Sequence, residues 1–317
     1  MVNDDLYQTM VDLVTVASGK IIWVGDEKQL SPVKQNYISK TFTESDKITL
    51  TTVHRQKKSV LHKVLEYLRN KPLRVFKSVE EDDISLLVYD DIKTMLNSYA
   101  PLFKFGSDAG ELNFIKLIAY TNKRIQALNE YIRKLIYNDY EEYHVGEILT
   151  GYDNCQYKSN LIENSKDYII TKVSKSTYSN YPAYDLILST GENEIPVKVL
   201  SKNLTQKEYT ELAKELEERR LEAIAKPQHG WRTFYVLNHA FLTPVDLVYN
   251  NRVIKRKSID YGYCISVHKS QGSTYQNVLI DMMNILRCQN NEELRQMQYV
   301  ACSRTSGNLL IYFKNDN

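Results

Sequence analysis

Residues 261–281 of the chain read YGYCISVHKSQGSTYQNVLID, and the other segments are best interpreted around them. Its apolar residues predict a β-strand over 263–267 and a second strand over 278–280. A short polar turn, 268–274, lies between them and is dense in hydrogen-bond donors. Positive charge, hydroxyl groups and a glycine that lets backbone N–H groups come close are what a phosphate group needs. The turn is therefore a candidate phosphate site, although serine, glutamine and glycine are also common in ordinary β-turns.

The composition predicts an intracellular globular protein. With 317 residues the chain is long enough for two or more domains. Hydrophobic residues make up 43% and charged residues 25%, which argues against a disordered or a membrane protein. The net charge is only +2, so any nucleic-acid surface must be local. The four cysteines are scattered, and neither a signal region nor a membrane span is recognisable, so we expect a cytoplasmic location and no membrane partner.

Strand and helix patterns alternate along much of the chain, which predicts an α/β fold with a parallel sheet. Helices are recognised by apolar residues on one face, and buried strands by short apolar runs. The expected helices cover residues 4–16, 60–68, 92–102, 125–136 and 291–302, and the expected strands cover 20–24, 84–88, 114–119 and 308–313.

The sequence pattern changes from about Gly146, where short β-like runs alternate with polar turns. These runs, at 168–170, 184–188 and 195–199, predict a small β-barrel inserted into the α/β domain. The sequence TQKE at 205–208 is a capping box that opens a mostly charged helix, which we expect to project or to pack along one edge.

Four residues outside the turn are candidates because of their position. Gln29 follows the expected strand 20–24 on the side where parallel α/β sheets bind ligands. Arg55 precedes a helix, where an arginine is more often a solvated surface charge than a ligand. Thr121 and Asn122 lie where a strand becomes a helix, so each is either a helix N-cap or a phosphate contact. The residues alone leave these alternatives open.

Five islands of sequence together resemble the motifs of one family. They are VGDEKQLSPV at 24–33, similar to helicase motif III; LTTVHRQ at 50–56, similar to motif IV; AYTN at 119–122, similar to motif IVa; SVHKSQGST at 266–274, similar to motif V; and YVACSR at 299–304, similar to motif VI. The chain thus resembles the superfamily 1 DNA helicases, in the 5′→3′ branch (superfamily 1B) that includes RecD and the phage helicase Dda. The HKSQG form favours this branch over UvrD-like enzymes.

The resemblance implies a fold and a domain organisation. The fold is α/β, with a RecA-like parallel sheet of the P-loop NTPase type as second motor domain, an inserted small β-barrel and a remnant of the first RecA-like domain. By the same resemblance, residues 1–79 are the remnant, 80–147 with 250–317 are the second RecA-like domain, and 148–249 are the barrel with its charged helix.

The resemblance also implies roles for individual residues. Gln29 would sense the γ-phosphate of ATP, and Arg55 and Arg304 would stabilise the transferring phosphoryl group from opposite sides. Gln271 and Gly272 would border the nucleotide. The residues that would line the path of single-stranded DNA are Thr121, Asn122, His268, Lys269, Ser270 and Thr274. ATP and Mg²⁺ are the implied cofactors, and no metal ligand is assigned in this chain.

A phosphate loop of the form G-x-x-x-x-G-K-[ST] is missing from the sequence, and so is the Asp-Glu pair that holds Mg²⁺ in the family. Residues 1–7 look like the continuation of motif II, so we expect a C-terminal portion whose N-terminal half is a separate chain or a misplaced start. Two functions follow. The chain is part of an ATP-dependent helicase that is inactive alone, or it is a non-catalytic single-stranded DNA-binding module derived from one.

Overall fold

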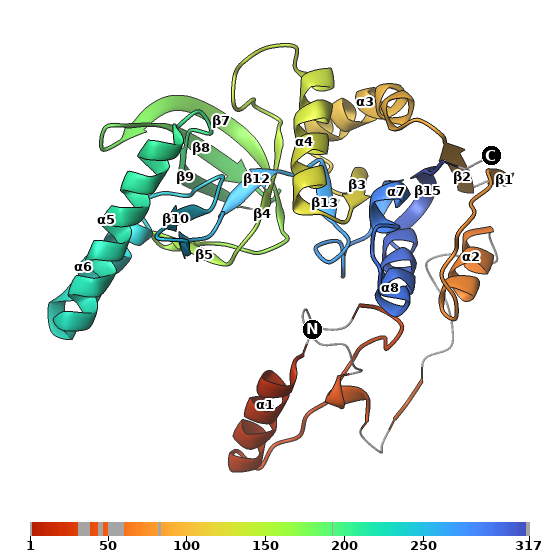
Figure 1. The fold of residues 1–317 in the computed structure, drawn as a ribbon, viewed down its shortest axis with the longest axis horizontal. Helices are drawn as coiled ribbons and strands as arrows, with labels where there is room; N and C mark the ends of the chain where they lie inside the picture. The colour runs from red at the N-terminus through yellow and green to blue at the C-terminus, as the bar shows by residue number, and fades with distance from the viewer. Residues whose placement is uncertain are drawn as a thin grey trace. The chain divides into compact units, whose positions relative to one another are not determined.

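Two packing units make up the chain. The computed structural model describes residues 2–30, 39–43, 47–49, 60–81, 84–191 and 193–314 (Figure 1). One unit contains residues 1–95, 116–125 and 265–317, and the other contains 96–115 and 126–264. We call them the first and the second unit. The three-part division by motif content expected from the sequence stays a prediction.

A six-stranded sheet runs through the first unit in the order β1-β2-β15-β14-β3-β13. Its strands are β1 (Val79–Glu81), β2 (Ile84–Tyr89), β15 (Thr305–Tyr312), β14 (Tyr275–Asp281), β3 (Ile115–Ala119) and β13 (Cys264–Ser266). β15 runs parallel to both β2 and β14, while β1 pairs with β2 antiparallel at one edge. In the pair of β14 and β15, Ile280 lies opposite Ile311. The centre of the sheet is therefore formed by parallel strands. The predicted α/β class is confirmed.

The central strands are buried because their sequences are almost continuously apolar. All five residues of β3 are buried, and in β14 only Gln276 is exposed. Such runs are typical of parallel strands covered on both faces. Three polar residues of β3 and β14 are also buried, namely Lys116, Asn277 and Asp281, and the Nζ of Lys116 lies 5.4 Å from the ring centre of Tyr275. The attraction between a cation and the face of an aromatic ring offsets part of the free energy that the cation loses when it leaves water.

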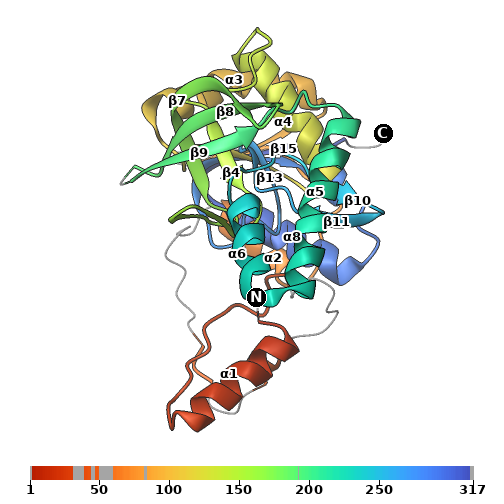
Figure 2. The same ribbon diagram turned by 90° about the vertical axis from the view of Figure 1, so that its left-hand side faces the viewer.

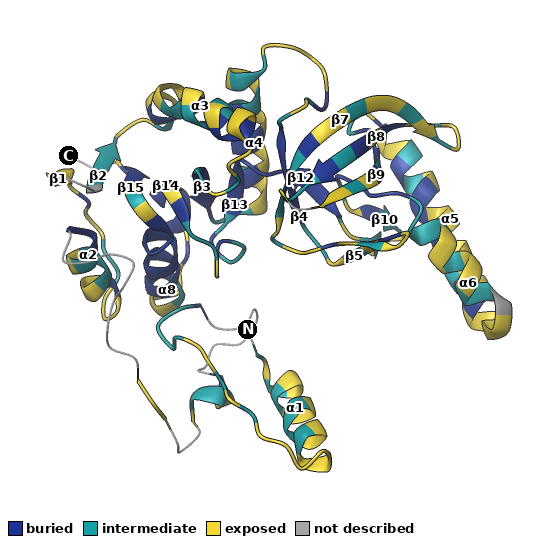
Figure 3. Cartoon of the chain, turned by 180° about the vertical axis from the view of Figure 1, so that it is seen from behind, coloured by how far each residue is buried: buried dark blue, intermediate teal, exposed yellow. Residues whose placement is uncertain are grey.

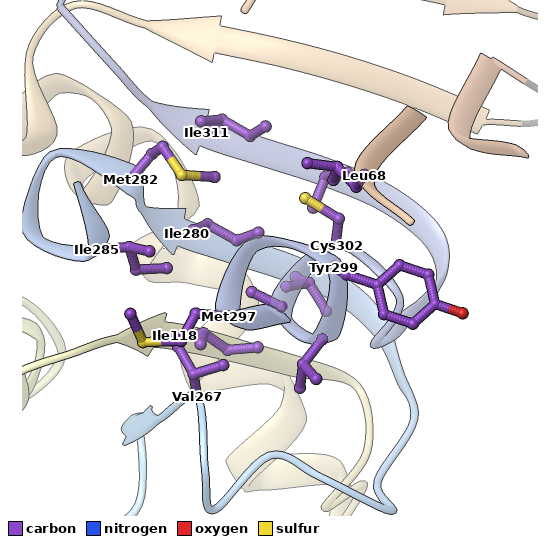
Figure 4. Close-up of a cluster of buried hydrophobic side chains, with 14 of the residues drawn as sticks. Leu68, Ile118, Val267, Ile280, Met282, Ile285, Met297, Tyr299, Cys302 and Ile311 are labelled. Atoms are coloured by element: carbon purple, nitrogen blue, oxygen red, sulfur yellow. The ribbon is translucent and has the colours of Figure 1, made fainter. Parts of the chain in front are cut away.

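Helix α8 (Asn291–Cys302) is the core helix of the first unit. Every residue from Leu294 to Cys302 is buried. Figure 4 shows Met297 of α8 in one cluster with Ile280 of β14 and Ile311 of β15. The short helix α7 (Met282–Ile285) and helix α2 (Val60–Leu68) contribute to the same cluster. The predicted helices at 60–68 and 291–302 are confirmed.

The N-terminal segment is mostly exposed, in contrast to the core. Helix α1 (Asp4–Val16) has the predicted bounds and no buried residue, as the colours in Figure 3 show. A 3₁₀ turn, η1 (Lys40–Phe42), follows further along. The expected buried strand at 20–24 is wrong: Ile22 is 86% and Val24 is 92% exposed, and no strand is formed there. Apolar residues make a buried strand only beside a neighbouring strand, and no strand of the described residues pairs with this segment.

An antiparallel five-stranded sheet, in the order β12-β4-β7-β8-β9, dominates the second unit. Its strands are β12 (Ile259–Tyr261), β4 (Ile148–Gly151), β7 (Asp167–Tyr178), β8 (Tyr181–Ser189) and β9 (Glu194–Leu200). Two small hairpins accompany it, β5 (Cys155–Tyr157) with β6 (Asn160–Ile162), and β10 (Leu247–Tyr249) with β11 (Arg252–Lys255).

The expected barrel is not confirmed as a closed barrel, because β12 and β9 do not pair in the sheet order. Single residues connect these two edge strands. The N–H of Leu242 donates to the carbonyl of Lys198 at 2.7 Å, and the N–H of Ser258 donates to the carbonyl of Thr243 at 2.8 Å. The insertion is therefore a curved sheet whose edges are linked by backbone hydrogen bonds.

Helices α5 (Gln206–Ala225) and α6 (Pro227–Asn238) lie side by side as a hairpin (Figure 1 and Figure 2). The predicted capping box is confirmed, since Thr205 and Glu208 exchange hydrogen bonds at the start of α5. Helix α6 was not among the helices expected from the sequence, because proline and glycine, here Pro227 and Gly230, are typical of turns. Proline is well suited to the first turn of a helix, and a Cβ on Gly230 would lie 2.4 Å from the Cα of Ala223, so glycine lets the two helices touch.

Two further helices complete the fold, α3 (Ile92–Ala109) and α4 (Asn122–Ile136). α3 runs seven residues past the predicted end at 102 and contains Pro101. None of the described helices is long and apolar enough to cross a membrane.

Candidate functional site

The polar turn between β13 and β14 is a compact series of backbone hydrogen bonds. Val267 donates its N–H to the carbonyl of Ala119 at 3.0 Å, which attaches the start of the turn to the end of β3. Gly272 has φ +86°, a left-handed conformation that glycine adopts without strain. Ser270 is fully buried and its hydroxyl donates to the carbonyl of Val267 at 2.8 Å. The turn thus fixes its own shape before any ligand binds.

Arg304 lies against this turn. Its guanidinium donates to the Ser273 carbonyl at 3.3 Å, to the Ser303 hydroxyl at 2.6 Å and to the Val300 carbonyl at 3.0 Å. Its own carbonyl accepts the N–H of Tyr275 at 2.8 Å. The side chain is only 3% exposed, so its charge acts in a poorly hydrated environment where electrostatic interactions are strong. The residues matched to motifs V and VI therefore meet.

Gln271 and Gly272, the expected nucleotide neighbours, directly precede Ser273, the contact of Arg304. The side-chain Oε1 of Gln271 is buried and accepts no hydrogen bond from the described residues. A buried acceptor without a donor is unfavourable by about 1–3 kcal/mol, so it is suited to meet a donor on a ligand. Thr274 is half-buried at the end of the same turn.

Gln29 is held by Asp26 in the loop before Leu30. The Asp26 carboxylate accepts the N–H of Lys28 at 3.0 Å, and it accepts the side-chain amide of Gln29 at 3.4 Å and the hydroxyl of Tyr299 at 3.1 Å. Tyr299 belongs to α8, which ends just before Arg304. The loop that carries Gln29 is therefore attached to the helix that leads to Arg304.

Helix α8 also forms hydrogen bonds with the backbone of the segment at the end of α2 and just after it. Gln298 is fully buried and forms two hydrogen bonds of 2.8 Å with the backbone N–H and carbonyl of Leu73. Arg295 donates to the carbonyls of Leu68 and Arg69, at 3.1 and 3.0 Å, where α2 ends. α2 begins at Val60, five residues after Arg55, but Arg55 itself lies outside the described residues. Its expected role stays a prediction.

The start of α4 is fixed by a buried asparagine. Asn284 of α7 is 3% exposed, and its Oδ1 accepts the N–H groups of Tyr120 and Thr121, each at 2.9 Å. Its amide donates to the Thr121 hydroxyl at 3.2 Å. Next to it, Arg124 forms an ion pair of 2.6 Å with Asp281, whose side chain is 1% exposed. Thr121 is thus satisfied within the protein, whereas Asn122 is exposed.

His268 and Lys269, which open the polar turn, are both half-buried. Burial lowers the pKa of His268, and the charge of Glu293 at the start of α8 opposes that shift. Burial and the same Glu293 raise the pKa of Tyr120, the residue before Thr121. The charge of Glu293 therefore acts on both segments that were expected to contact DNA.

The described residues bring most of the predicted site together in the first unit. Arg304 meets the turn of Gln271 and Gly272, and Gln29 is joined to α8 through Asp26. Sequence reasoning assigned no role to Tyr299 or Asp26, although both lie inside motif-like islands. It also missed Asn284, whose only signal was its place just after a strand. No set of three or more His, Cys, Asp or Glu side chains in the described ranges is arranged to hold a metal ion.

Comparisons with known proteins agree with the order of these segments. A family model described as an AAA domain matches residues 1–84, and one described as the UvrD-like helicase C-terminal domain matches residues 261–312. The protein R530 of Acanthamoeba polyphaga mimivirus, described as uncharacterized, is 20% identical in an alignment 370 positions long, gaps included, which covers 98% of this chain and 72% of that protein.

A second relative is a named helicase. The ATP-dependent DNA helicase dda of Enterobacteria phage T4 is 31% identical in an alignment of 136 positions, which covers 41% of this chain and only 30% of that protein. Among solved structures, the Pif1 helicase from Bacteroides in complex with ADP-AlF3 and ssDNA is 15% identical with a TM-score of 0.49, over 99% of this chain and 69% of that chain.

The two family models cover the ends of the chain in the same order as the motif-like islands, with the AAA match over motifs III and IV and the helicase C-terminal match over motifs V and VI. The phage helicase adds identity along 136 residues. These matches support the resemblance of the chain to the superfamily 1 DNA helicases of the RecD- and Dda-like branch.

Proposed function

We propose that the chain is part of an ATP-dependent DNA helicase that moves 5′→3′ along single-stranded DNA and unwinds duplex. The observation that carries this proposal is the joint attachment of Arg304, through the carbonyl of Val300, and of the Gln29 loop, through Tyr299, to helix α8. A protein that only binds DNA does not need an arginine and a glutamine loop that are both attached to one helix beside a turn suited to phosphate.

The chain's own residues act on the terminal phosphate of ATP. Arg304 places a fixed positive charge where negative charge develops on the transferring phosphoryl oxygens, an effect of about 10³ to 10⁵ in rate for such arginines. Its hydrogen bonds to Ser273 and Ser303 orient the guanidinium in advance. Gln29 contacts the same phosphate and so senses whether it is bound. In this proposal Arg55 approaches from the opposite side, and Gln271 and Gly272 border the nucleotide.

ATP binding in this proposal also needs a phosphate loop and the acidic pair that holds Mg²⁺, which residues 1–317 do not contain. We propose that a partner polypeptide, an N-terminal helicase half, supplies both and polarises the attacking water. The exposed apolar side chains of the N-terminal segment support such a partner. Leu13 is 65%, Val16 87%, Ile22 86% and Val24 92% exposed, and patches of this kind mark interaction surfaces.

Single-stranded DNA is the proposed second ligand. Asn122, His268, Lys269 and Thr274 are all at least partly accessible and follow the ends of β3 and β13. Thr121 and Ser270 use their hydroxyl groups within the protein, so in this proposal they shape the path and do not contact DNA with those groups. Because phosphate contacts release counterions, binding should weaken as salt rises and show little base preference.

A second candidate function is a non-catalytic single-stranded DNA-binding module. The partly accessible polar side chains at the ends of β3 and β13 favour it, because they can contact DNA without a nucleotide. The two functions differ in what a partner can restore, because a module that lost its motor gains no turnover from an added phosphate-loop half.

The experiment is DNA-stimulated ATP turnover of the 317-residue chain, with and without an N-terminal phosphate-loop half. Association of the two pieces is first checked by size-exclusion chromatography. We expect no turnover by the chain alone and turnover in the complex that rises with oligo-dT. Unwinding of duplexes with a 5′ tail but not a 3′ tail tests the direction. A stable complex without turnover contradicts the proposed motor.

A further inference from the structure

Asp26 collects three donors around one carboxylate. Its Oδ1 accepts the backbone N–H of Lys28 at 3.0 Å. Its Oδ2 accepts the side-chain amide of Gln29 at 3.4 Å and the hydroxyl of Tyr299 at 3.1 Å. The backbone carbonyl of Asp26 in addition accepts the N–H of Gln29 at 3.1 Å. Two of these donors are local, whereas Tyr299 is 273 residues away in the sequence.

Tyr299 is a rigid support for this loop because its ring is fixed on the core helix. It is 8% exposed and belongs to the same hydrophobic cluster as Leu30, which follows Gln29. The guanidinium of Arg69 lies 5.8 Å from the centre of its ring. Burial and the charge of Asp26 raise the pKa of the Tyr299 hydroxyl, while Arg69 and Arg304 oppose the shift. The hydroxyl is therefore protonated near neutral pH and donates to Asp26.

Helix α8 connects three parts of the site along its length. Its N-terminal half packs in one hydrophobic cluster with Tyr120 and Val267, where the two expected DNA-binding segments begin. Tyr299 in its last turns donates to Asp26, and Arg304 follows its end. The rise of about 1.5 Å per helical residue separates Glu293 and Tyr299 by roughly 9 Å. A small displacement of a fully packed helix is transmitted along its length, because packed interiors are dense and hardly compressible.

We propose that Tyr299 is a positioning residue that sets the placement of Gln29 through Asp26 and so joins the γ-phosphate sensor to the helix that also faces the DNA-binding segments. The proposal rests on the proposed function for its consequence, because Gln29 is a sensor only in a helicase. Its structural core, the support of the Asp26 loop by the Tyr299 hydroxyl, is independent of ATP and of DNA.

The first test is amide hydrogen exchange of the 317-residue chain, read at Lys28 and Gln29. Tyr299→Phe removes only the hydroxyl and leaves the ring in the core. A hydrogen bond to a charged group is strong enough that its loss should speed exchange at these two amides by on the order of tenfold. Tyr312→Phe, which removes a tyrosine hydroxyl on β15, is the matched control and should leave exchange at Lys28 and Gln29 unchanged. Equal exchange in wild type and Tyr299→Phe overturns the proposal.

A second variant separates positioning from general loosening of the core. Asp26→Ala removes the acceptor from the partly exposed loop and leaves α8 intact. It should speed exchange at Gln29 as Tyr299→Phe does, and in the Asp26→Ala background Tyr299→Phe should have no further effect at Gln29. An additional effect there would show that Tyr299 acts through core packing, which contradicts the proposal.

The functional arm adds oligo-dT to the same chains. In wild type we expect DNA to change exchange at Lys28 and Gln29. Tyr299→Phe should bind the oligonucleotide within about twofold of wild type but lose that response. Persistence of the response in Tyr299→Phe overturns the role in coupling. Failure of wild type to bind oligo-dT contradicts the proposed function instead, and the exchange comparison without DNA still decides the role of Tyr299.

With an active phosphate-loop complex, the kinetic signature is distinct. Tyr299→Phe should lower kcat by on the order of tenfold with KM for ATP unchanged, because placement of the sensor matters in the transition state and not for nucleotide binding. A change in KM alone contradicts a role in placing Gln29.

Discussion

Replacement of Asn284 by alanine should destabilise the first unit at the start of α4. The Oδ1 of Asn284 accepts two backbone N–H groups, those of Tyr120 and Thr121, each at 2.9 Å. Alanine leaves both donors without that acceptor, and an unsatisfied buried donor costs about 1–3 kcal/mol. Tyr120 and Thr121 are half-buried, so water recovers part of each bond. We therefore expect a total loss of about 2–3 kcal/mol in the free energy of unfolding.

Urea unfolding followed by circular dichroism measures this loss. The matched control is Asn97→Ala, which removes an exposed asparagine on α3 that accepts one hydrogen bond of 3.2 Å from Tyr131. The control should stay within about 0.5 kcal/mol of wild type. A change of less than about 0.5 kcal/mol in Asn284→Ala would refute the reasoning, because the two amides would then have no need of Asn284.

Asn284→Asp separates the acceptor from the amide group. The carboxylate can still accept both N–H groups, but it lies beside Asp281, whose side chain is 1% exposed and paired with Arg124. Two carboxylates in one buried place repel each other. We expect stability between those of wild type and Asn284→Ala at neutral pH, measured by the same urea titration. A variant more stable than wild type would contradict this balance of effects.

The remaining predictions concern the turn, the proposed role of Arg304, pH and salt. Gly272→Ala should lower stability by about 1 kcal/mol in the same titration, because φ is +86° while nothing lies within 4 Å of the added Cβ. Arg304→Ala in the phosphate-loop complex should lower ATP turnover at least about 10³-fold while oligo-dT binding is kept. Burial raises the pKa of Glu147 to about 7, with Arg133 opposing, so the folded state binds the proton more tightly than the unfolded state. The contribution of Glu147 to stability is therefore present in full below about pH 4.5 and is lost as pH rises to about 7, and Glu147→Gln should remove this pH dependence of unfolding. The affinity for oligo-dT, measured by fluorescence anisotropy, should fall steeply between low and high salt.

Local patterns made several elements predictable from the sequence. The apolar spacing of 4–16 gave α1 its bounds, and the capping box at Thr205 and Glu208 marked the start of α5. The strand, turn and strand around residues 261–281 formed as expected, because the apolar runs are bounded by a turn that glycine can close. These features depend on neighbours in the sequence.

Features that depend on distant partners could not be predicted in this way. The segment with Ile22 and Val24 has strand-forming residues, but it forms no strand in the absence of a pairing neighbour in the described chain. Helix α6 contains Pro227 and Gly230, which usually indicate a turn. Here Pro227 lies in the first turn of the helix, and Gly230 permits the close approach to α5. The contact of Tyr299 with Asp26 joins two motif-like islands through space, and no spacing rule indicates it. For the candidate site, the sequence identified the islands and the structure supplied their connections.

The central claim is that this chain carries the arginine and sensor side of a DNA-dependent ATPase. The most direct measurement is ATP turnover by the 317-residue chain in a stable complex with a phosphate-loop half, with and without oligo-dT, for wild type and Arg304→Ala. The account predicts turnover that DNA stimulates in wild type and that Arg304→Ala abolishes. Turnover that is indifferent to both DNA and Arg304, or no turnover in a complex shown to be intact, would contradict it.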